Sequence, residues 1–143
     1  MRVLLDTNIL LDVVEKREPY FSDSYQVFKL SATKEIDAII GAGSVTDIYY
    51  VVRKNCKNVE KAAGYIIDLF KVVTFVDTKA ADIQEALKFS FSDFEDAVVA
   101  ATAARENASY IITRNVDDFS KSPVPAINPA DFLKKHGAEL SKR

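Results

Sequence analysis

"MRVLLDTNIL" (residues 1–10) begins with an apolar run that stops abruptly at an acid, Asp6. Residues 2–6 are typical of a short buried strand that ends at this acid. Apolar side chains then recur at helical spacing over residues 8–17, which predicts a helix directly after the strand. Because a strand that leads into a helix is the repeating unit of α/β proteins, Asp6 is expected where such a unit turns.

The same alternation of strand and helix continues along the chain. Further strands are predicted over 36–41, 72–77, 110–115 and 124–127, and further helices over 21–34, 44–55, 59–70, 79–89, 93–107 and 129–137. Strands that alternate with helices form a parallel sheet covered on both faces. We therefore predict a three-layer α/β/α fold with a parallel sheet of about five strands. No internal repeat or linker interrupts the pattern, so a single domain over 1–143 is expected.

The composition excludes several kinds of site. The 143 residues include one cysteine, Cys56, and one histidine, His136, so no internal disulfide, cysteine-based zinc site or histidine pair is available. His136 lies near the C-terminus, where we expect it to be exposed to solvent. The net charge of −2 does not suit a protein that coats nucleic acid through a basic surface. No run approaches the roughly 20 apolar residues of a membrane span, and no signal pattern is present, which predicts a cytoplasmic protein.

Acidic residues gather at the ends of the predicted strands and at the starts of the predicted helices. They are Asp6, Asp47, Asp93, Glu95, Asp96, Asp117 and Asp118, with the amide Asn115 beside the last two. Ligands of parallel α/β sheets bind beyond the carboxyl ends of the strands. The fold would therefore bring acids from distant parts of the chain to one edge of the sheet.

Helix capping is the simpler explanation for some of these acids. Ser44-x-x-Asp47 resembles a capping box, and Ser92-x-x-Glu95 is one. Acids in a first helical turn are also stabilised by the helix dipole. Capping does not account for Asp6, because a helix that begins near Asn8 does not require it. Nor does one box account for three acids between residues 93 and 96.

A metal site explains the set better. Several carboxylates close together repel one another, and a cation allows them to stay ionised together. Oxygen ligands without histidine or cysteine favour Mg²⁺ or Mn²⁺. One or two such ions can activate a water molecule and hold a phosphodiester during in-line displacement, which is chemistry that needs no histidine.

Four segments together resemble a known family: LLDTNILLD, SVTDIYYVVRK, DFEDAVVAATA and YIITRNVDDF. The first alone is a weak signal, but their order and spacing form a strong combination that covers nearly the whole chain. The sequence is similar to PIN-domain ribonucleases of the kind found as toxins in bacterial type II toxin–antitoxin pairs (VapC-like). The resemblance implies the α/β/α fold and a nuclease site made of acids.

The resemblance also assigns roles by position. It implies Asp6, Asp47 and Asp96 as the catalytic acids, with Asn115 and Asp118 as further candidate metal ligands. Asp47 stands where the family usually has the longer glutamate, and Asn115 stands where many members carry aspartate. Small polar residues and one acid match positions that orient ligands or water: Thr7, Asn8, Asp93 and Thr113. Arg114 follows the fourth strand and is a candidate contact for a substrate phosphate.

These assignments predict an endoribonuclease that depends on Mg²⁺ or Mn²⁺, cuts RNA and acts as the toxin of a toxin–antitoxin pair. Because Asp47 and Asn115 depart from the family pattern, a catalytically weak or inactive PIN-like module that binds RNA or protein remains the alternative. Metal affinity separates the two, since a module that only binds does not need a metal. The RNA that is cut and the number of metal ions stay open.

Two protein partners are expected. The resemblance implies a small antitoxin whose tail covers the acidic cleft. The helix over 59–70 is apolar around more of its surface than one core-facing stripe requires, so a homodimer through this helix or the helix over 44–55 is predicted. Burial of the same residues by neighbouring helices is the competing explanation.

Overall fold

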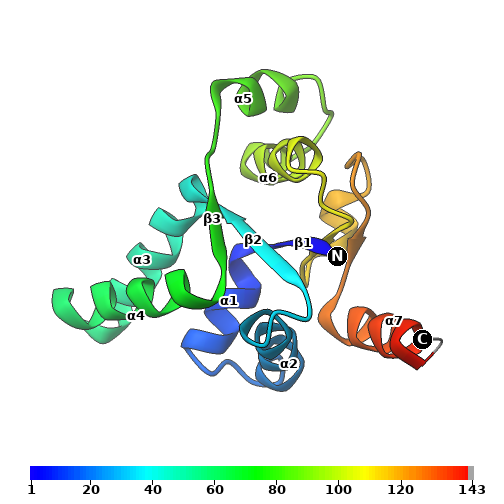
Figure 1. The fold of residues 1–143 in the computed structure, drawn as a ribbon. Helices are drawn as coiled ribbons and strands as arrows, with labels where there is room; N and C mark the ends of the chain where they lie inside the picture. The colour runs from blue at the N-terminus through cyan, green and yellow to red at the C-terminus, as the bar shows by residue number, and fades with distance from the viewer. Residues whose placement is uncertain (142–143) are drawn as a thin grey trace.

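A five-stranded parallel sheet forms the centre of the computed structural model, which describes residues 1–141 (Figure 1). The strands are β1 (Arg2–Leu5), β2 (Asp37–Gly41), β3 (Thr74–Val76), β4 (Tyr110–Ile112) and β5 (Ala126–Ile127). Their order is β3-β2-β1-β4-β5, and all neighbours run parallel. The predicted fold class is therefore confirmed. β1 lies between β2 and β4, and Leu5 pairs with Ile112, so the carboxyl ends of β1 and β4 are adjacent.

Helices cover both faces of this sheet. They are α1 (Thr7–Val14), α2 (Phe21–Ala32), α3 (Ala42–Cys56), α4 (Val59–Val72), α5 (Ala80–Ala86), α6 (Phe94–Arg105) and α7 (Pro129–Ser141), with a 3₁₀ turn, η1 (Val116–Phe119). Figure 1 shows α5 and α6 on one side of the sheet, with α1 to α4 on the other. No helix of the described chain is both long and apolar enough to cross a bilayer.

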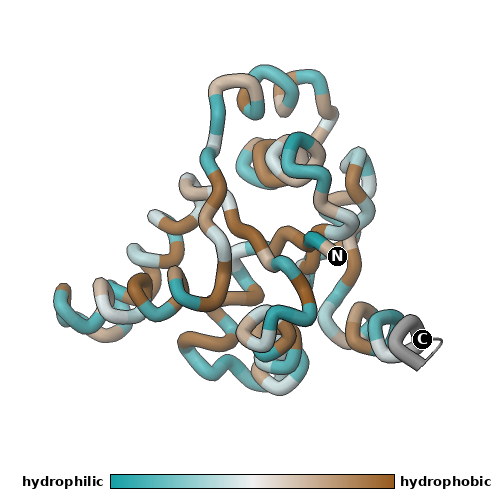
Figure 2. The backbone as a smooth tube through the Cα atoms, in the orientation of Figure 1, coloured by the Kyte–Doolittle hydropathy of each residue, from teal (hydrophilic) through white to brown (hydrophobic). Residues whose placement is uncertain are grey.

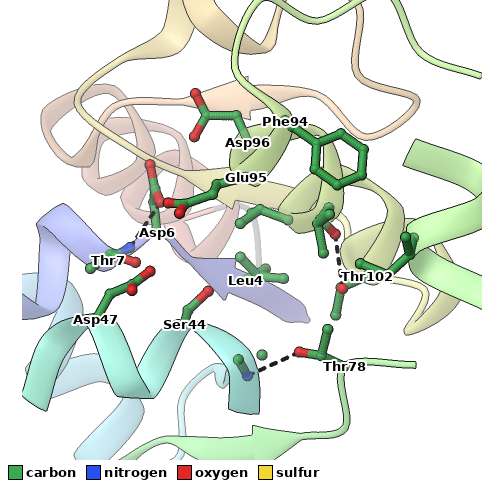
Figure 3. Close-up of a pocket in the computed structure, with 15 residues that line it drawn as sticks. Leu4, Asp6, Thr7, Ser44, Asp47, Thr78, Phe94, Glu95, Asp96 and Thr102 are labelled. Atoms are coloured by element: carbon green, nitrogen blue, oxygen red, sulfur yellow. Dashed lines mark hydrogen bonds between the residues drawn. The ribbon is translucent and has the colours of Figure 1, made fainter. Parts of the chain in front are cut away.

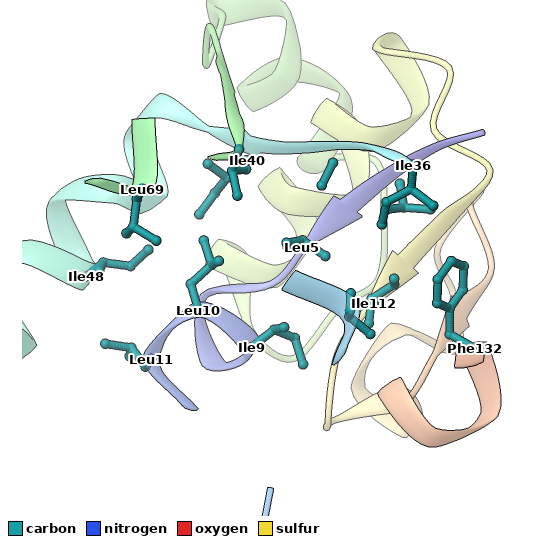
Figure 4. Close-up of a cluster of buried hydrophobic side chains, with 14 of the residues drawn as sticks. Leu5, Ile9, Leu10, Leu11, Ile36, Ile40, Ile48, Leu69, Ile112 and Phe132 are labelled. Carbon is teal, nitrogen blue, oxygen red and sulfur yellow. The ribbon is translucent and has the colours of Figure 1, made fainter. Parts of the chain in front are cut away.

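The larger hydrophobic core lies between the sheet and α1 to α4. Val3 and Leu5 of β1 face this side and pack with Ile9 and Leu10 of α1 (Figure 4). Leu4 faces the opposite side, because successive strand residues alternate, and contributes to the smaller core beneath α6. Each fully buried leucine or isoleucine contributes roughly 1.5–3 kcal/mol to folding. Figure 2 shows the central strands as mainly hydrophobic, as expected for a parallel sheet covered on both faces.

α6 lies close to the sheet because its inner face is built from alanine. Ala100 and Ala103 are fully buried against Leu4 and Ile111. Their single methyl groups let the helix approach the strands closely. This packing fixes the start of α6, which carries three of the predicted acids, beside the carboxyl end of β1.

The expectation that His136 is exposed to solvent is wrong. Its ring is buried and stacks on Phe132, with ring centroids 5.8 Å apart and planes 16° apart. Phe132 anchors α7 in the larger core, and His136 follows it one turn later on the same face of the helix. Neither ring nitrogen has a hydrogen-bond partner among the described residues.

Candidate active site

Asp6 occupies the joint between β1 and α1, where both of its carboxylate oxygens are held. It is the N-cap of α1: Oδ1 accepts a hydrogen bond of 2.8 Å from the backbone nitrogen of Thr7. Oδ2 accepts one of 2.8 Å from the hydroxyl of Thr113. The expectation that capping plays no part at Asp6 is therefore wrong, because α1 begins at Thr7 and not at Asn8. These bonds fix the carboxylate's orientation at the end of the central strand.

Thr113 links Asp6 to the turn after β4. Its buried hydroxyl donates to Asp6 and accepts a hydrogen bond of 3.0 Å from the backbone nitrogen of Asn115. β4 ends at Ile112, earlier than predicted, because residues 113–115 leave the strand and lead into η1. Thr113 thus positions both the acid and the backbone at Asn115.

The structure changes the interpretation of Asp47. α3 begins at Ala42 with Gly41 as its N-cap, so its first turn contains no acid. Asp47 lies in the second turn, and the predicted capping box from Ser44 to Asp47 does not form. With capping removed as an explanation, the side chain is free for another role. Figure 3 shows its carboxylate directed toward Asp6.

The start of α6 carries two acids into the same region. Its N-cap is Asp93, which accepts a hydrogen bond of 3.2 Å from the backbone nitrogen of Asp96, so the cap lies one residue later than the box predicted from Ser92. Asp96 lies near Asp6, while Glu95 projects toward the space between Asp6 and Asp47 (Figure 3). The sequence indicates Glu95 only as part of the run 93–96 and of a capping box, and the structure adds it to the residues that line the candidate site.

These acids surround one end of a cavity of about 300 Å³. Its lining includes four of the predicted site residues, Asp6, Thr7, Asp47 and Asp96, and also Glu95. The other predicted residues do not line this cavity: Asn8, Asp93, Thr113, Arg114, Asn115 and Asp118.

Mutual repulsion among the acids shows in their proton affinities. The pKa of Asp96 is raised to about 7, first by burial and then by the negative charges of Asp6, Asp93, Asp118 and Glu95. Burial also raises the pKa of Asp6, although the hydrogen bonds from Thr113 and Thr7 oppose this rise. Asp118 is therefore close enough to act on Asp96 electrostatically. Such a site favours a proton or a metal cation over an unneutralised cluster of carboxylates.

The raised pKa of Asp96 predicts a specific loss of stability with pH. The folded state holds a proton that the unfolded state releases near 3.8, so stability falls as pH rises from about 4 to about 7. In thermal melts with EDTA, the melting temperature of Asp96→Asn should fall less over this pH window than that of the parent protein. Asp68→Asn, at an exposed position of α4, is the control, and its melting temperature should fall as much as that of the parent. Parallel curves for Asp96→Asn and the parent would contradict the prediction.

Arg114 meets an acid that sequence analysis missed. Its Nε donates a hydrogen bond of 2.9 Å to Oδ2 of Asp12, which is completely buried in α1, and Ser24 of α2 donates to the same oxygen. The guanidinium lies 4.0 Å from the centre of the Tyr20 ring. Nη1 and Nη2 have no hydrogen-bond partner among the described residues. Asp12 therefore holds the guanidinium group through Nε alone. The positive charge of Arg114 also lowers the pKa of Asp6 and so favours its charged form.

The donor set fits a hard divalent cation. Within residues 1–141, no three carboxylate, imidazole or thiolate groups converge closely enough to enclose an ion as they stand. Mg²⁺ keeps several of its waters, however, and is usually bound through one or two carboxylates. Asp6 and Asp96 supply two carboxylates at this cavity, and Asp47 and Glu95 line it as well.

A family model described as the PIN domain matches residues 2–117. The chain belongs to the PIN domain family. Among curated proteins it is 21% identical over 139 residues to Ribonuclease VapC1 of Aquifex aeolicus, with 94% of each chain covered. This family membership confirms the resemblance on which the site assignments depend.

Solved structures share the fold. VapBC2 from Rickettsia felis, bound to a DNA fragment from its promoter, has a chain that matches with a TM-score of 0.72 and 22% identity, covering 90% of this protein and 98% of that chain. A chain of a toxin–antitoxin complex from Klebsiella pneumoniae matches with a TM-score of 0.65 and 19% identity, covering 89% and 97%. At these identities the likeness establishes the PIN fold.

Proposed function

We propose that this PIN-domain protein is an endoribonuclease that depends on Mg²⁺ or Mn²⁺, and that it is the toxin of a toxin–antitoxin pair. The observation that carries the proposal is the pair Asp6 and Asp96, which line the same cavity and whose negative charges repel each other. The distant relationship to a ribonuclease, VapC1, supports the choice of RNA. A protein of this kind would act in the cytoplasm, where its RNA is found.

The residues have distinct roles in this proposal. Asp6 and Asp96 hold the metal, and Asp47 and Glu95 extend the set of ligands on either side. When bound, the metal supplies an activated water and neutralises charge on the phosphodiester. Thr7 and Thr113 keep Asp6 oriented through their hydrogen bonds.

The remaining predicted residues lie around this centre. Asn115 and Asp118 follow β4 beside Thr113, with Asp118 close enough to influence Asp96. Asn8 accepts a hydrogen bond of 3.5 Å from the backbone of Arg114. Nη1 and Nη2 of Arg114 do not bond to Asp12. We propose that these two nitrogens donate to a phosphate of the RNA, because the edge of a guanidinium group matches the geometry of a phosphate.

The chemistry of the products tests this function. If the attacking group is water, cleavage leaves a phosphate monoester on one product and a hydroxyl on the other. If the adjacent 2′-hydroxyl attacks, a 2′,3′-cyclic phosphate forms. We expect RNA incubated with the protein and Mn²⁺ to yield ends with a monoester. Absence of cleavage would favour the alternative of a module that only binds RNA or protein. Ends with a cyclic phosphate would contradict attack by a metal-activated water.

An antitoxin is the proposed regulatory partner. The related Klebsiella pneumoniae structure is a toxin–antitoxin complex, which supports a protein partner for this chain. We place the tail of that partner over the acidic cavity, because occupation of this cleft would exclude RNA.

We also propose a homodimer through the outer faces of α3 and α4. An apolar groove of about 600 Å³ runs between them, lined by residues that include Val45, Tyr49, Ile66 and Ile67. Ile67 and, at the end of α4, Phe70 are exposed in the described chain, so neighbouring helices do not bury them. A stable dimer would bury more than about 2,000 Å² in total.

Light scattering tests the dimer at micromolar concentration. The measured mass of the parent protein should be twice that of one chain. The measured mass of Ile67→Asp should be that of a single chain, because the substitution places a charge in an apolar interface. Lys61→Asp, a charge change at an exposed site on the same helix, is the matched control. A parent protein that stays monomeric contradicts the proposal.

A further inference from the structure

The end of the cavity opposite the acids has a different chemistry. It is lined mainly by apolar side chains: Leu4, Ile83, Phe94, Val98 and Val99. The side chains of Phe94 and Ile83 are 46% and 38% exposed, and Phe94 has no aromatic partner among the described residues. Figure 3 shows the Phe94 ring on the side of the cavity away from Asp6 and Asp47. An exposed aromatic face beside a polar centre is a surface on which a flat ring can stack.

One polar group is fixed in this apolar wall. The hydroxyl of Thr78 accepts a hydrogen bond of 3.0 Å from the backbone nitrogen of Gly43. Its own proton has no acceptor among the described residues, so Thr78 can donate to a ligand in the cavity. Ser44, the next residue of α3, also lines the cavity. Thr102 differs, because its hydroxyl already donates within α6.

Two glycines allow Thr78 to approach α3 so closely. A Cβ atom at Gly41 would lie 3.2 Å from the Thr78 hydroxyl oxygen, and one at Gly43 would lie 3.1 Å from it. Both distances are shorter than most Cβ contacts in proteins, so a larger residue would require Thr78 to shift by a few tenths of an ångström. The sequence at the start of α3 therefore sets the position of the Thr78 donor.

We propose that Phe94, Ile83 and Thr78 form a subsite for one unstacked nucleobase of single-stranded RNA, next to the phosphodiester that is cut. The inference rests on the proposed nuclease function. With the phosphate near the acids, the attached base extends toward the apolar end of the same cavity. Its flat face stacks on Phe94, and an acceptor on its edge receives the proton of Thr78. Unpaired bases are recognised in this way by aromatic rings and edge hydrogen bonds.

RNA binding tests the stacking surface separately from cleavage. The probe is a short fluorescent single-stranded RNA of randomised sequence, and the protein carries Asp6→Asn so that it does not cut. Adding Phe94→Ala should weaken binding about 5- to 150-fold, because a base loses its aromatic partner. Phe94→Tyr should bind like the Asp6→Asn protein. Leu87→Ala removes a 71% exposed side chain at the C-cap of α5, outside the cavity, and is the matched control, with no change expected.

Base preference tests Thr78. Cleavage of a randomised RNA pool by the otherwise unmodified protein, followed by sequencing of the ends, should show a preference at one position beside the cut. Thr78→Val should change that preference at this position alone, while Thr78→Ser should retain it. Thermal melts of each variant check that the fold is intact.

The outcomes separate the two claims. Absence of cleavage by the parent protein overturns the nuclease function, and the binding measurement then still tests the subsite. RNA affinity unaffected by Phe94→Ala overturns the subsite, whatever the activity. An unchanged base preference in Thr78→Val overturns the role of its hydroxyl.

Discussion

Asp6→Asn should abolish RNA cleavage and leave the protein folded. The asparagine side chain keeps an oxygen that can cap α1 and accept from Thr7 or Thr113. It lacks the negative charge that the metal requires. Loss of this charge also relieves repulsion with Asp96, so the melting temperature in EDTA should equal or exceed that of the parent. The measurements are cleavage of RNA in Mn²⁺ and a thermal melt.

A matched aspartate at the opposite end of the sheet provides the control. Asp37 begins β2 and pairs with Arg2 on the surface. Asp37→Asn should cut RNA at the parental rate. An Asp6→Asn protein that cuts as well as the parent would show that Asp6 serves only as a helix cap.

Asp82→Ala should destabilise the protein by roughly 3–5 kcal/mol, the cost of breaking a buried ion pair from one side. Asp82 is 2% exposed and accepts hydrogen bonds from Arg105 at 2.7 and 3.0 Å. Its carboxylate also accepts from Thr102 and from the backbone nitrogen of Lys79. The substitution removes this shared acceptor, although Thr102 keeps the carbonyl oxygen of Val98 and Arg105 keeps that of Asp77. Because folded domains are stable by only about 5–15 kcal/mol, this is a large share of the total.

Urea denaturation measures this loss, with two comparisons. Glu85→Ala, on the same helix as Asp82, removes the partner of Lys88 from an exposed pair and should change stability by less than about 1 kcal/mol. The double replacement Asp82→Leu with Arg105→Met should recover much of the loss, since apolar side chains can replace a buried pair. An Asp82→Ala protein as stable as the parent would mean that α5 does not depend on this contact.

The order of apolar and polar residues was sufficient to predict the sheet. β1 and β2 are almost entirely apolar, and the helices between strands have helical periodicity, so the parallel α/β arrangement follows from local patterns. The same patterns placed Asp6 and Asp96 at the carboxyl edge. These positions depend on the strand ends, which the sequence marks by an abrupt change from apolar to acidic residues.

Contacts between distant segments were not predictable in the same way. Asp12 interrupts an apolar helix face, but nothing nearby indicates that Arg114 covers it 102 residues later. α3 begins at Ala42, earlier than its polar residues suggest, and includes Gly43, whose backbone nitrogen donates to the Thr78 hydroxyl 35 residues later. This shift moved Asp47 out of the first turn. His136 is buried because α7 docks through Phe132, a tertiary contact that composition cannot reveal.

The dependence of RNA cleavage on Mn²⁺ is the most direct test of the account. The rate should rise with Mn²⁺ concentration to a plateau, fall to background when EDTA is added, and return when Mn²⁺ is restored in excess. The acids around Asp6 and Asp96 would then be shown to act through a bound cation. Cleavage that persists in EDTA at the plateau rate would contradict the metal site and leave the acids to be explained by capping and packing.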